Sequence, residues 1–285
     1  MKKNVIVIGG SGQLGQCLSE VVAVKNDMFS YVFLSKEDLN LVNADEIAKL
    51  FEQYKPLYCI NCAAYTAVDQ AEEDHDRVFE INEFAVKRLA ENCLAHHTTL
   101  IHISTDFVFN GSSSIPLTEN MDASPVNVYG LSKLKGEQRI QEIMDQYFIL
   151  RTSWLYSEKA NNFVKTMLKL AQSRDTLTVI FDQIGTPTYA MDLARVIVNI
   201  IQNDKQAYGL YHYSNEGIAS WYDFAKAVFE FAEVDMKVLP VASSAFVTKA
   251  KRPHYSVMDK TKIKTVLDVE IPYWRDSLNF CIQNL

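Results

Sequence analysis

The chain of 285 residues lacks an excess of positive charge and lacks long hydrophobic runs. It carries 28 lysines and arginines against 35 aspartates and glutamates, which gives a net charge of -7. A nucleic-acid surface depends on clustered cations, so we expect none here. No apolar stretch approaches the roughly 18 residues that a membrane span requires, and the first apolar run lacks the pattern of a signal peptide. We therefore expect a cytoplasmic protein that binds neither nucleic acid nor a membrane.

Cysteine is also sparse, with five residues in the whole chain. Cys59 and Cys62 form a CxxC motif, which can indicate redox chemistry or zinc. The pair falls on a predicted strand, where side chains three residues apart point to opposite faces. No second cysteine pair or suitably spaced histidine pair completes a zinc site. We interpret the cysteines as structural thiols and expect no metal site.

Strand-like and helix-like segments alternate along the first half of the chain. Strands are predicted at 4–8, 31–34, 57–61, 100–103 and 148–151, and helices at 13–24, 45–54, 77–96 and 127–144. This order is typical of an α/β protein with a Rossmann-type, doubly wound parallel sheet.

The alternation loosens after Thr152, although a further strand at 178–181 and a helix at 191–201 are still expected. We predict a dinucleotide-binding domain at 1–152, with a returning segment near 177–203. The segments 153–176 and 204–285 are then expected to form a smaller C-terminal lobe that binds the substrate. No low-complexity linker separates the two parts, so they should share a cleft.

A glycine-rich loop, GGSGQLG, follows the first predicted strand and opens the first predicted helix. Glycines at such a junction let the backbone approach a diphosphate, and the helix N-terminus offers free N–H groups to the anion. Gly10, Gly12 and Gly15 give the GxGxxG spacing, whereas Gly9, Gly12 and Gly15 give the GxxGxxG spacing of short-chain reductases. The loop predicts a dinucleotide site without choosing between the two templates.

Two YxxxK motifs are present, Tyr129 with Lys133 and Tyr222 with Lys226. The first follows the fourth predicted strand and the Ser-Thr-Asp run at 104–106, at the sheet edge where α/β proteins bind ligands. The second lies on a helix whose other positions are those of an ordinary core. We therefore assign chemistry to the first motif alone.

Residues four apart on a helix share a face, so Lys133 can approach both Tyr129 and a cofactor ribose. A phenol has a pKa of about 10, and a nearby ammonium and a cationic nicotinamide would lower it. Thr105 could hold a substrate carbonyl through its hydroxyl. The combination predicts hydride transfer to a ketone, with Tyr129 as the proton donor.

At this point the sequence resembles the extended short-chain dehydrogenase/reductases, and within them the dTDP-4-dehydrorhamnose reductases. The resemblance covers nearly the whole chain. It rests on GGSGQLG at 9–15, NCAAYTAVDQAE at 61–72, ISTDFVF at 103–109, SPVNVYGLSK at 124–133, RTSWLY at 151–156, NNFVKTM at 161–167 and DQIGTPT at 182–188.

The resemblance implies NAD(P)H-dependent reduction of the 4-keto group of dTDP-4-dehydro-L-rhamnose to dTDP-L-rhamnose, and it assigns residues to this reaction. The implied catalytic residues are Tyr129, Lys133 and Thr105, with Asn82 in support. The implied cofactor-binding residues are Gly9, Gly12, Gln13, Leu14, Gly15, Asn40, Leu41, Ala63, Ala64, Tyr65 and Lys133. The implied substrate-binding residues are Thr105, Asp106, Tyr129, Trp154, Asn162 and Arg252, the last of them suited to a diphosphate.

The sequence departs from this family at two positions. Asn40 stands where an aspartate usually precedes the residue that meets the adenine, and Phe107 stands where tyrosine is common. Related dehydratases place a glutamate at the position of Phe107, so dehydration is not expected. Another nucleotide-sugar reductase or an epimerase stays open, as does a non-catalytic regulatory subunit of the methionine adenosyltransferase type.

The expected cofactor is NADPH, with some use of NADH. Ser35 and Lys36 occupy the region where an acidic residue would select NAD, although Glu37 and Asp38 follow closely. A homodimer is left open. Some relatives dimerise through acidic side chains and a metal, and the aligned positions here are Cys17 and Met191, which disfavours that arrangement.

Overall fold

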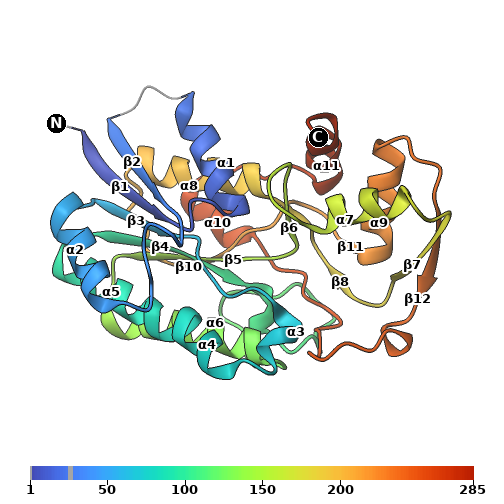
Figure 1. The fold of residues 1–285 in the computed structure, drawn as a ribbon, viewed down its shortest axis with the longest axis horizontal. Coiled ribbons are helices and arrows are strands. Elements are labelled where there is room, and N and C mark those ends of the chain that lie inside the picture. Colours follow the sequence, from blue (N-terminus) through green and yellow to red (C-terminus); the bar gives the residue numbers. More distant parts are fainter. Residues whose placement is uncertain (1, 25–27) are drawn as a thin grey trace.

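A computed structural model describes residues 2–24 and 28–285. Its centre is a six-stranded, fully parallel sheet in the spatial order β10-β5-β4-β3-β1-β2 (Figure 1). The strands are β1 (Lys3–Ile8), β2 (Phe29–Leu34), β3 (Tyr58–Asn61), β4 (Thr99–Thr105), β5 (Tyr147–Thr152) and β10 (Gly209–His212). Central strands such as β1 are apolar on both faces, because helices cover the sheet on both sides.

Helices pack on both faces of this sheet, as the doubly wound prediction requires. The helices α1 (Gln13–Ala23) and α8 (Ala190–Gln202) contact one another on one face. The other face carries α2 (Ala44–Tyr54), α5 (Ala85–Ala95) and α6 (Val128–Ile143) (Figure 1). Two buried apolar clusters fill the two sides of the sheet. The predicted fold class is therefore confirmed.

The predicted helix at 77–96 is interrupted. It consists of α4 (His75–Phe79), the π-helical segment η1 (Glu80–Phe84) and α5. A single π-turn inside an α-helix often marks a functional site, and this one carries Asn82. The short helix α3 (Val68–Ala71) and the 3₁₀ turn η2 (Asp106–Val108) complete the first half of the chain.

The C-terminal half supplies a second lobe of small sheets and helices. Its paired strands are β6 (Leu155–Tyr156) with β9 (Thr188–Tyr189), β7 (Thr176–Ile180) with β12 (Lys237–Val241), and β8 (Ile184–Gly185) with β11 (Ala219–Ser220). Its other elements are α7 (Phe163–Ala171), α9 (Trp221–Phe231), η3 (Ser243–Ala245) and α11 (Trp274–Gln283). Helix α10 (Thr261–Leu267) belongs to the same part of the sequence but contacts β10 of the main sheet.

Two elements differ from the predicted division of the chain. The segment 204–285 contains β10, which pairs with β5 in the main sheet, and the returning segment contains β7, which pairs with β12 in the second lobe. Both strands are short, and their partners are distant in sequence, so local periodicity carried no signal of where they belong. The chain therefore crosses between the lobes more often than the prediction assumed.

All five cysteines are free thiols, four of them buried, in agreement with their interpretation as structural residues. Cys17 and Met191 also lie in the core where α1 meets α8. Within residues 2–24 and 28–285, no helix combines the length and apolar character that crossing a bilayer requires.

The order of strands reverses between β1 and β3, because the chain leaves β1 for β2 on one side and returns to β3 on the other. Ligands of open α/β sheets bind in the crevice at such a point, beyond the carboxyl ends of the strands. The glycine loop after β1 and the segment after β3 both begin there.

Candidate functional site

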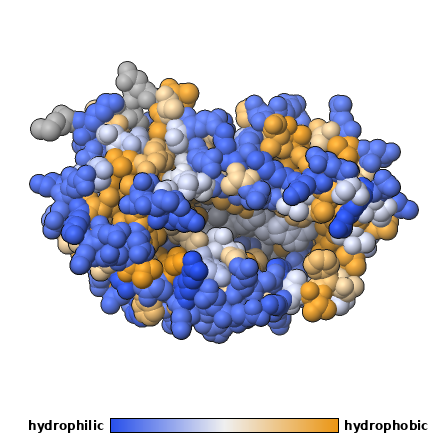
Figure 2. All heavy atoms as spheres, viewed as in Figure 1, coloured by the Kyte–Doolittle hydropathy of each residue, from blue (hydrophilic) through white to orange (hydrophobic). Residues whose placement is uncertain are grey.

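A cleft of about 810 Å³ opens at this reversal point and runs between the lobes. Figure 2 shows the surface hollowed near the centre of the molecule. The first lobe lines it with the glycine loop and the ends of β2, β3 and β4, and the second lobe contributes Trp154, Leu155, Ala160, Asn161 and Trp221. A cleft of this size accommodates a small-molecule ligand or cofactor.

The glycine loop is built so that most added side chains would collide with backbone. A Cβ on Gly15 would strike the Gly9 carbonyl oxygen, and Gly9 itself has φ +81° and packs against the segment after β3. Gly10 packs against Phe33 of β2. Gly12, in contrast, is the N-cap of α1, where a Cβ would approach only the Gly9 oxygen, at 3.2 Å. No acidic residue occupies the first turn of α1, so its N–H groups are available to an anion.

The two glycines should respond differently to alanine. Gly15→Ala is expected to lower both the stability of the protein and its affinity for NADPH, because the new methyl group displaces the loop backbone. Gly12→Ala should leave the unfolding midpoint nearly unchanged and still weaken NADPH binding. Thermal unfolding and titration calorimetry separate the two effects. Equal losses of stability in both variants would contradict this assignment.

Most of the predicted cofactor-binding residues line the cleft. Gly9, Gly12, Gln13, Leu14, Gly15, Asn40, Leu41, Ala63, Ala64 and Lys133 are all part of its wall. Tyr65 is not; its backbone N–H and carbonyl are both bonded to the Asn82 side chain, and Thr66 takes its place in the wall. The Asn40 side-chain oxygen accepts the Val42 N–H at 3.1 Å, so it shapes the loop that borders the cleft.

Thr105, Asp106 and Tyr129 come together at the carboxyl end of β4. The Thr105 hydroxyl donates to Asp106 Oδ1 at 3.1 Å and accepts the Phe107 N–H at 3.2 Å. The Phe107 ring meets Tyr129 edge-on, with the centroids 5.8 Å apart, so Phe107 packs against the Tyr129 ring. All four residues line the cleft.

The protonation states of these groups follow from their burial. Burial raises the pKa of Asp106 to about 6, against opposing hydrogen bonds from Ser256 and Thr105. Burial also raises the pKa of Tyr129 to about 12, with Thr105 lowering it and Asp106 raising it. The expectation that Lys133 lowers the pKa of Tyr129 is not met in the free protein, because the Lys133 amine is directed to other partners. Tyr129 is therefore a protonated phenol at neutral pH, as a proton donor must be.

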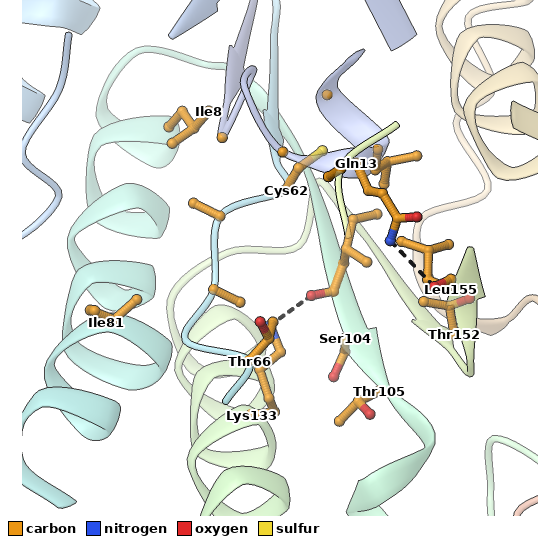
Figure 3. A pocket seen from close by; sticks show the side chains of 18 of the residues that line it. Ile8, Gln13, Cys62, Thr66, Ile81, Ser104, Thr105, Lys133, Thr152 and Leu155 are labelled. Atoms are coloured by element: carbon orange, nitrogen blue, oxygen red, sulfur yellow. Dashed lines mark hydrogen bonds between the residues drawn. The ribbon is translucent and has the colours of Figure 1, made fainter. Parts of the chain in front are cut away.

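Lys133 lies beneath the cleft with its side chain 2% exposed. Its Nζ donates to the Ile103 carbonyl at 2.7 Å, a bond drawn in Figure 3, and lies 3.2 Å from His102 Nε2. Burial lowers the pKa of Lys133 to about 8, while Glu137 and Cys62 act in the opposite direction. The amine is therefore poised to gain or lose a proton near neutrality.

Close packing holds the helix that carries Tyr129 and Lys133. A Cβ on Gly130 would strike the Phe107 carbonyl oxygen, and one on Gly136 would strike the carbonyl oxygen of Asn82. The Asn82 side chain donates to the Ser132 hydroxyl at 3.0 Å. Helix α6 is thus fixed against β4 and against the π-helical segment, which supports the predicted role of Asn82.

Trp154 lines the cleft from the second lobe in a left-handed backbone conformation, φ +48°. Such a conformation is costly for a bulky residue and is often kept at functional sites. Its ring stacks on Trp221 with centroids 3.7 Å apart and planes 11° apart. Both indoles line the cleft and add apolar surface to its wall.

Two predicted substrate residues have other partners in the structure. Asn162 caps α7 by accepting the Lys165 N–H, and its amide donates to Gln13 Oε1 at 3.0 Å, so it joins the lobes at the glycine loop. Arg252 forms a two-bond ion pair with Asp69, at 2.8 and 3.1 Å. Neither side chain lines the cleft; both hold the two lobes together.

The structure also reveals buried polar residues that the sequence reading missed. Glu137 and Arg151 form an ion pair with bonds of 2.6 and 2.9 Å, and Ser104 donates to the same glutamate. Glu137 lies four residues beyond Lys133, and so on the same helix face. That spacing, YxxxKxxxE, was the available signal. For His102, which is buried on β4, the sequence offered no signal beyond its position in a predicted strand.

The residues at the carboxyl end of β2 bear on the choice of cofactor. Ser35 and Lys36 line the cleft, whereas Glu37 and Asp38 do not. The Asp38 carboxylate turns back to accept from the backbone and hydroxyl of Ser35, at 2.9 and 2.7 Å, and these bonds lower its pKa. Arg77 of α4 adds a second cation to the wall. The cleft wall at the end of β2 therefore carries the cation of Lys36 and neither of the two carboxylates that follow it.

Comparison with known proteins agrees with this geometry. The family model described as RmlD substrate binding domain matches residues 2–285. The curated dTDP-4-dehydrorhamnose reductase of Aggregatibacter actinomycetemcomitans is 39% identical, spanning 96% of this chain and 96% of its own. The solved dTDP-4-dehydrorhamnose reductase of Bacillus anthracis, in complex with NADP, is 37% identical with a TM-score of 0.96, covering 100% of both chains. That of Clostridium acetobutylicum is 38% identical with a TM-score of 0.95, covering 99% of both chains.

Proposed function

The chain belongs to the RmlD substrate binding domain family, and from this membership we propose that it is a dTDP-4-dehydrorhamnose reductase. It reduces the 4-keto group of dTDP-4-dehydro-L-rhamnose to dTDP-L-rhamnose, with NADPH as the electron source. The family resemblance found in the sequence is confirmed by the comparisons.

One observation carries the proposal for this chain. Tyr129, Lys133 and Thr105 line the same cleft as the glycine loop, although they come from two different elements that are distant from it in the sequence. A proton donor is thereby held beside a dinucleotide cradle.

The residues present fit NADPH. Gly12 leaves room at an uncapped helix N-terminus, where a diphosphate can accept backbone N–H groups. Leu41 and Ala63 border the cleft with apolar surface, and Ser35 and Lys36 lie at its end. When bound, the cofactor supplies the hydride.

The protein's own residues supply orientation and the proton. The Thr105 hydroxyl turns from Asp106 Oδ1 to hold the carbonyl oxygen, and Tyr129 Oη gives its proton to that oxygen as C4 is reduced. The ketone becomes a secondary alcohol, and the tyrosinate that remains regains a proton from solvent. A phenol with a raised pKa is not ionised at neutral pH, so it is ready to donate to the more basic alkoxide.

The remaining substrate contacts are proposals. We assign Trp154 to a face of the nucleotide or sugar ring, because it lines the cleft as a stacked indole. Asp106 is assigned to a sugar hydroxyl. Arg252 can serve a substrate diphosphate only by exchanging Asp69 for it, and Asn162 acts by positioning Gln13.

Turnover tests the proposed function. Purified protein with NADPH and dTDP-4-dehydro-L-rhamnose should consume NADPH, and other nucleotide-linked ketosugars should be slower substrates. A protein that binds NADPH without turning over any of these sugars would instead be a regulatory subunit, and the proposal would fail.

Cofactor preference is a further test. We expect higher kcat/KM with NADPH than with NADH, and Lys36→Glu should lower that ratio by roughly tenfold, because a phosphate loses a charge-assisted contact. Lys49→Glu, on α2 and outside the cleft wall, is the matched control. A protein that prefers NADH before any substitution would contradict the assignment.

We also propose that the enzyme works in the cytoplasm. Its five free thiols are those that a reducing compartment maintains. A homodimer, if formed, is not expected to use Cys17 or Met191, because both are buried between α1 and α8.

A further inference from the structure

His102 lies below Lys133, on the far side from the cleft. The ring is completely buried on β4, and its Nε2 lies 3.2 Å from Lys133 Nζ. Its Nδ1 lies 3.1 Å from the amide nitrogen of Asn61, on the neighbouring strand β3. Burial, and secondarily the charge of Lys133, hold the pKa of His102 well below its ordinary value. The ring is therefore neutral and carries one proton, either on Nδ1 or on Nε2.

The orientation of the Asn61 amide determines which of the two nitrogens carries the proton. Its side-chain oxygen accepts the Ala63 backbone N–H at 3.1 Å, which fixes the amide so that the NH₂ group points to His102. Turning the amide over would place this NH₂ group against the Ala63 N–H. His102 Nδ1 must accept the Asn61 hydrogen, so the ring proton lies on Nε2.

A proton on Nε2 faces the Lys133 amine. An ammonium has only donors and cannot accept this hydrogen, whereas a neutral amine has a lone pair that can. The neutral amine can accept from His102 and still donate to the Ile103 carbonyl, 2.7 Å away. We propose that His102 is a positioning residue which, through the fixed amide of Asn61, presents Nε2–H to Lys133 and favours the neutral amine before the cofactor enters.

Other charged and titratable groups surround the His102–Lys133 pair. Glu137, on the same helix, is bonded to Arg151 of β5, and the Cys62 thiol follows β3. Both favour the ammonium, while burial opposes it. Tyr129 stays protonated. The Asn61–His102 pair thus adds to the effect of burial.

The inference rests on the proposed function only in treating Lys133 as a catalytic group, and the ring proton can be observed without turnover. His212 provides an internal reference. Its Nδ1 lies 3.0 Å from the Leu117 carbonyl, which can only accept, so this buried ring must carry its proton on Nδ1. The structure therefore predicts two buried neutral histidines with opposite tautomers.

Long-range ¹H–¹⁵N correlation spectra of the free protein test this directly, with His102→Gln to assign the signals. We expect His102 with its proton on Nε2 and His212 with its proton on Nδ1. The same tautomer at both positions, or a doubly protonated His102 at pH 6, would overturn the proposal.

Asn61→Asp is the matched variant, since aspartate has the same shape but accepts at both oxygens. His102 should then move its proton to Nδ1 and accept from the Lys133 ammonium. The kcat/KM for NADPH should fall as the pH rises through the range in which Lys133 loses its proton, and this fall should lie about one pH unit higher in the variant than in the parent protein. His102→Gln should move it in the same direction.

A merely structural role for His102 would lower activity at every pH without moving the basic limb. If Asn61→Asp does not fold, the tautomers of the parent protein and the profile of His102→Gln still decide the question. An unmoved basic limb in every variant that folds would overturn the proposal. If the enzyme reduces no ketosugar at all, the spectra alone still test it.

Discussion

Tyr129→Phe is expected to lower kcat by about 10²- to 10⁴-fold, the usual range for loss of a general acid. The ring would keep its edge-on contact with Phe107, so the cleft should keep its shape. NADPH affinity should change little, because the phenol hydroxyl, and not the ring, is removed. Steady-state kinetics and NADPH titration measure the two quantities.

The second YxxxK motif offers the matched control. Tyr222 lies on α9 and, unlike Tyr129, does not line the cleft. Tyr222→Phe should therefore retain nearly full activity. Equal activity in the two variants would show that Tyr129 does not donate the proton, and a large loss only for Tyr222→Phe would place the chemistry elsewhere.

Arg151→Met is expected to lower the free energy of unfolding by about 3–5 kcal/mol, because it leaves a buried carboxylate without its partner. Arg151 is 4% exposed and Glu137 1%. Denaturant unfolding checks the value. The paired variant, Arg151→Met with Glu137→Leu, should recover much of the loss, since two apolar groups replace the buried charges.

An exposed ion pair provides the comparison. Lys87 and Glu91 lie 3.6 Å apart on α5, with side chains 46% and 51% exposed. Lys87→Met should change the free energy of unfolding by about 0.5 kcal/mol or less, because water screens the pair. If Lys87→Met and Arg151→Met lower the free energy of unfolding by similar amounts, the buried ion pair contributes no more to stability than the exposed one.

Local patterns in the sequence were enough to predict the sheet and its helices. The strands β1, β3, β4 and β5 are dense apolar runs, and apolar residues repeat with helical period in α1 and α2, so each of these elements could be located alone. β10 could not be placed, because four residues with a long-range partner carry little local signal. The sequence did not predict the π-helical segment at Asn82 either, and its close contact with Gly136 of α6 joins residues that are distant in the sequence.

The candidate site also contains residues that the local sequence predicts and residues that it does not. Tyr129, Lys133 and Thr105 carry recognisable chemistry at a recognisable place in the fold, and the structure brings them together. Arg252 and Asn162 were assigned by resemblance, and their visible partners, Asp69 and Gln13, come from distant segments that no local pattern connects. The hydrogen-bond partners of a buried polar group such as His102 lie on other elements, so its role could not be predicted from the local sequence.

Transfer of the cofactor hydrogen tests the central claim most directly. NADPH carrying deuterium at both C4 positions of the nicotinamide is incubated with the protein and dTDP-4-dehydro-L-rhamnose, and the sugar product is analysed by mass spectrometry and NMR. We predict dTDP-L-rhamnose with one deuterium, located at C4 of the sugar, and almost none formed by Tyr129→Phe. Recovery of the unreduced ketosugar, or a product without deuterium at C4, would contradict the account.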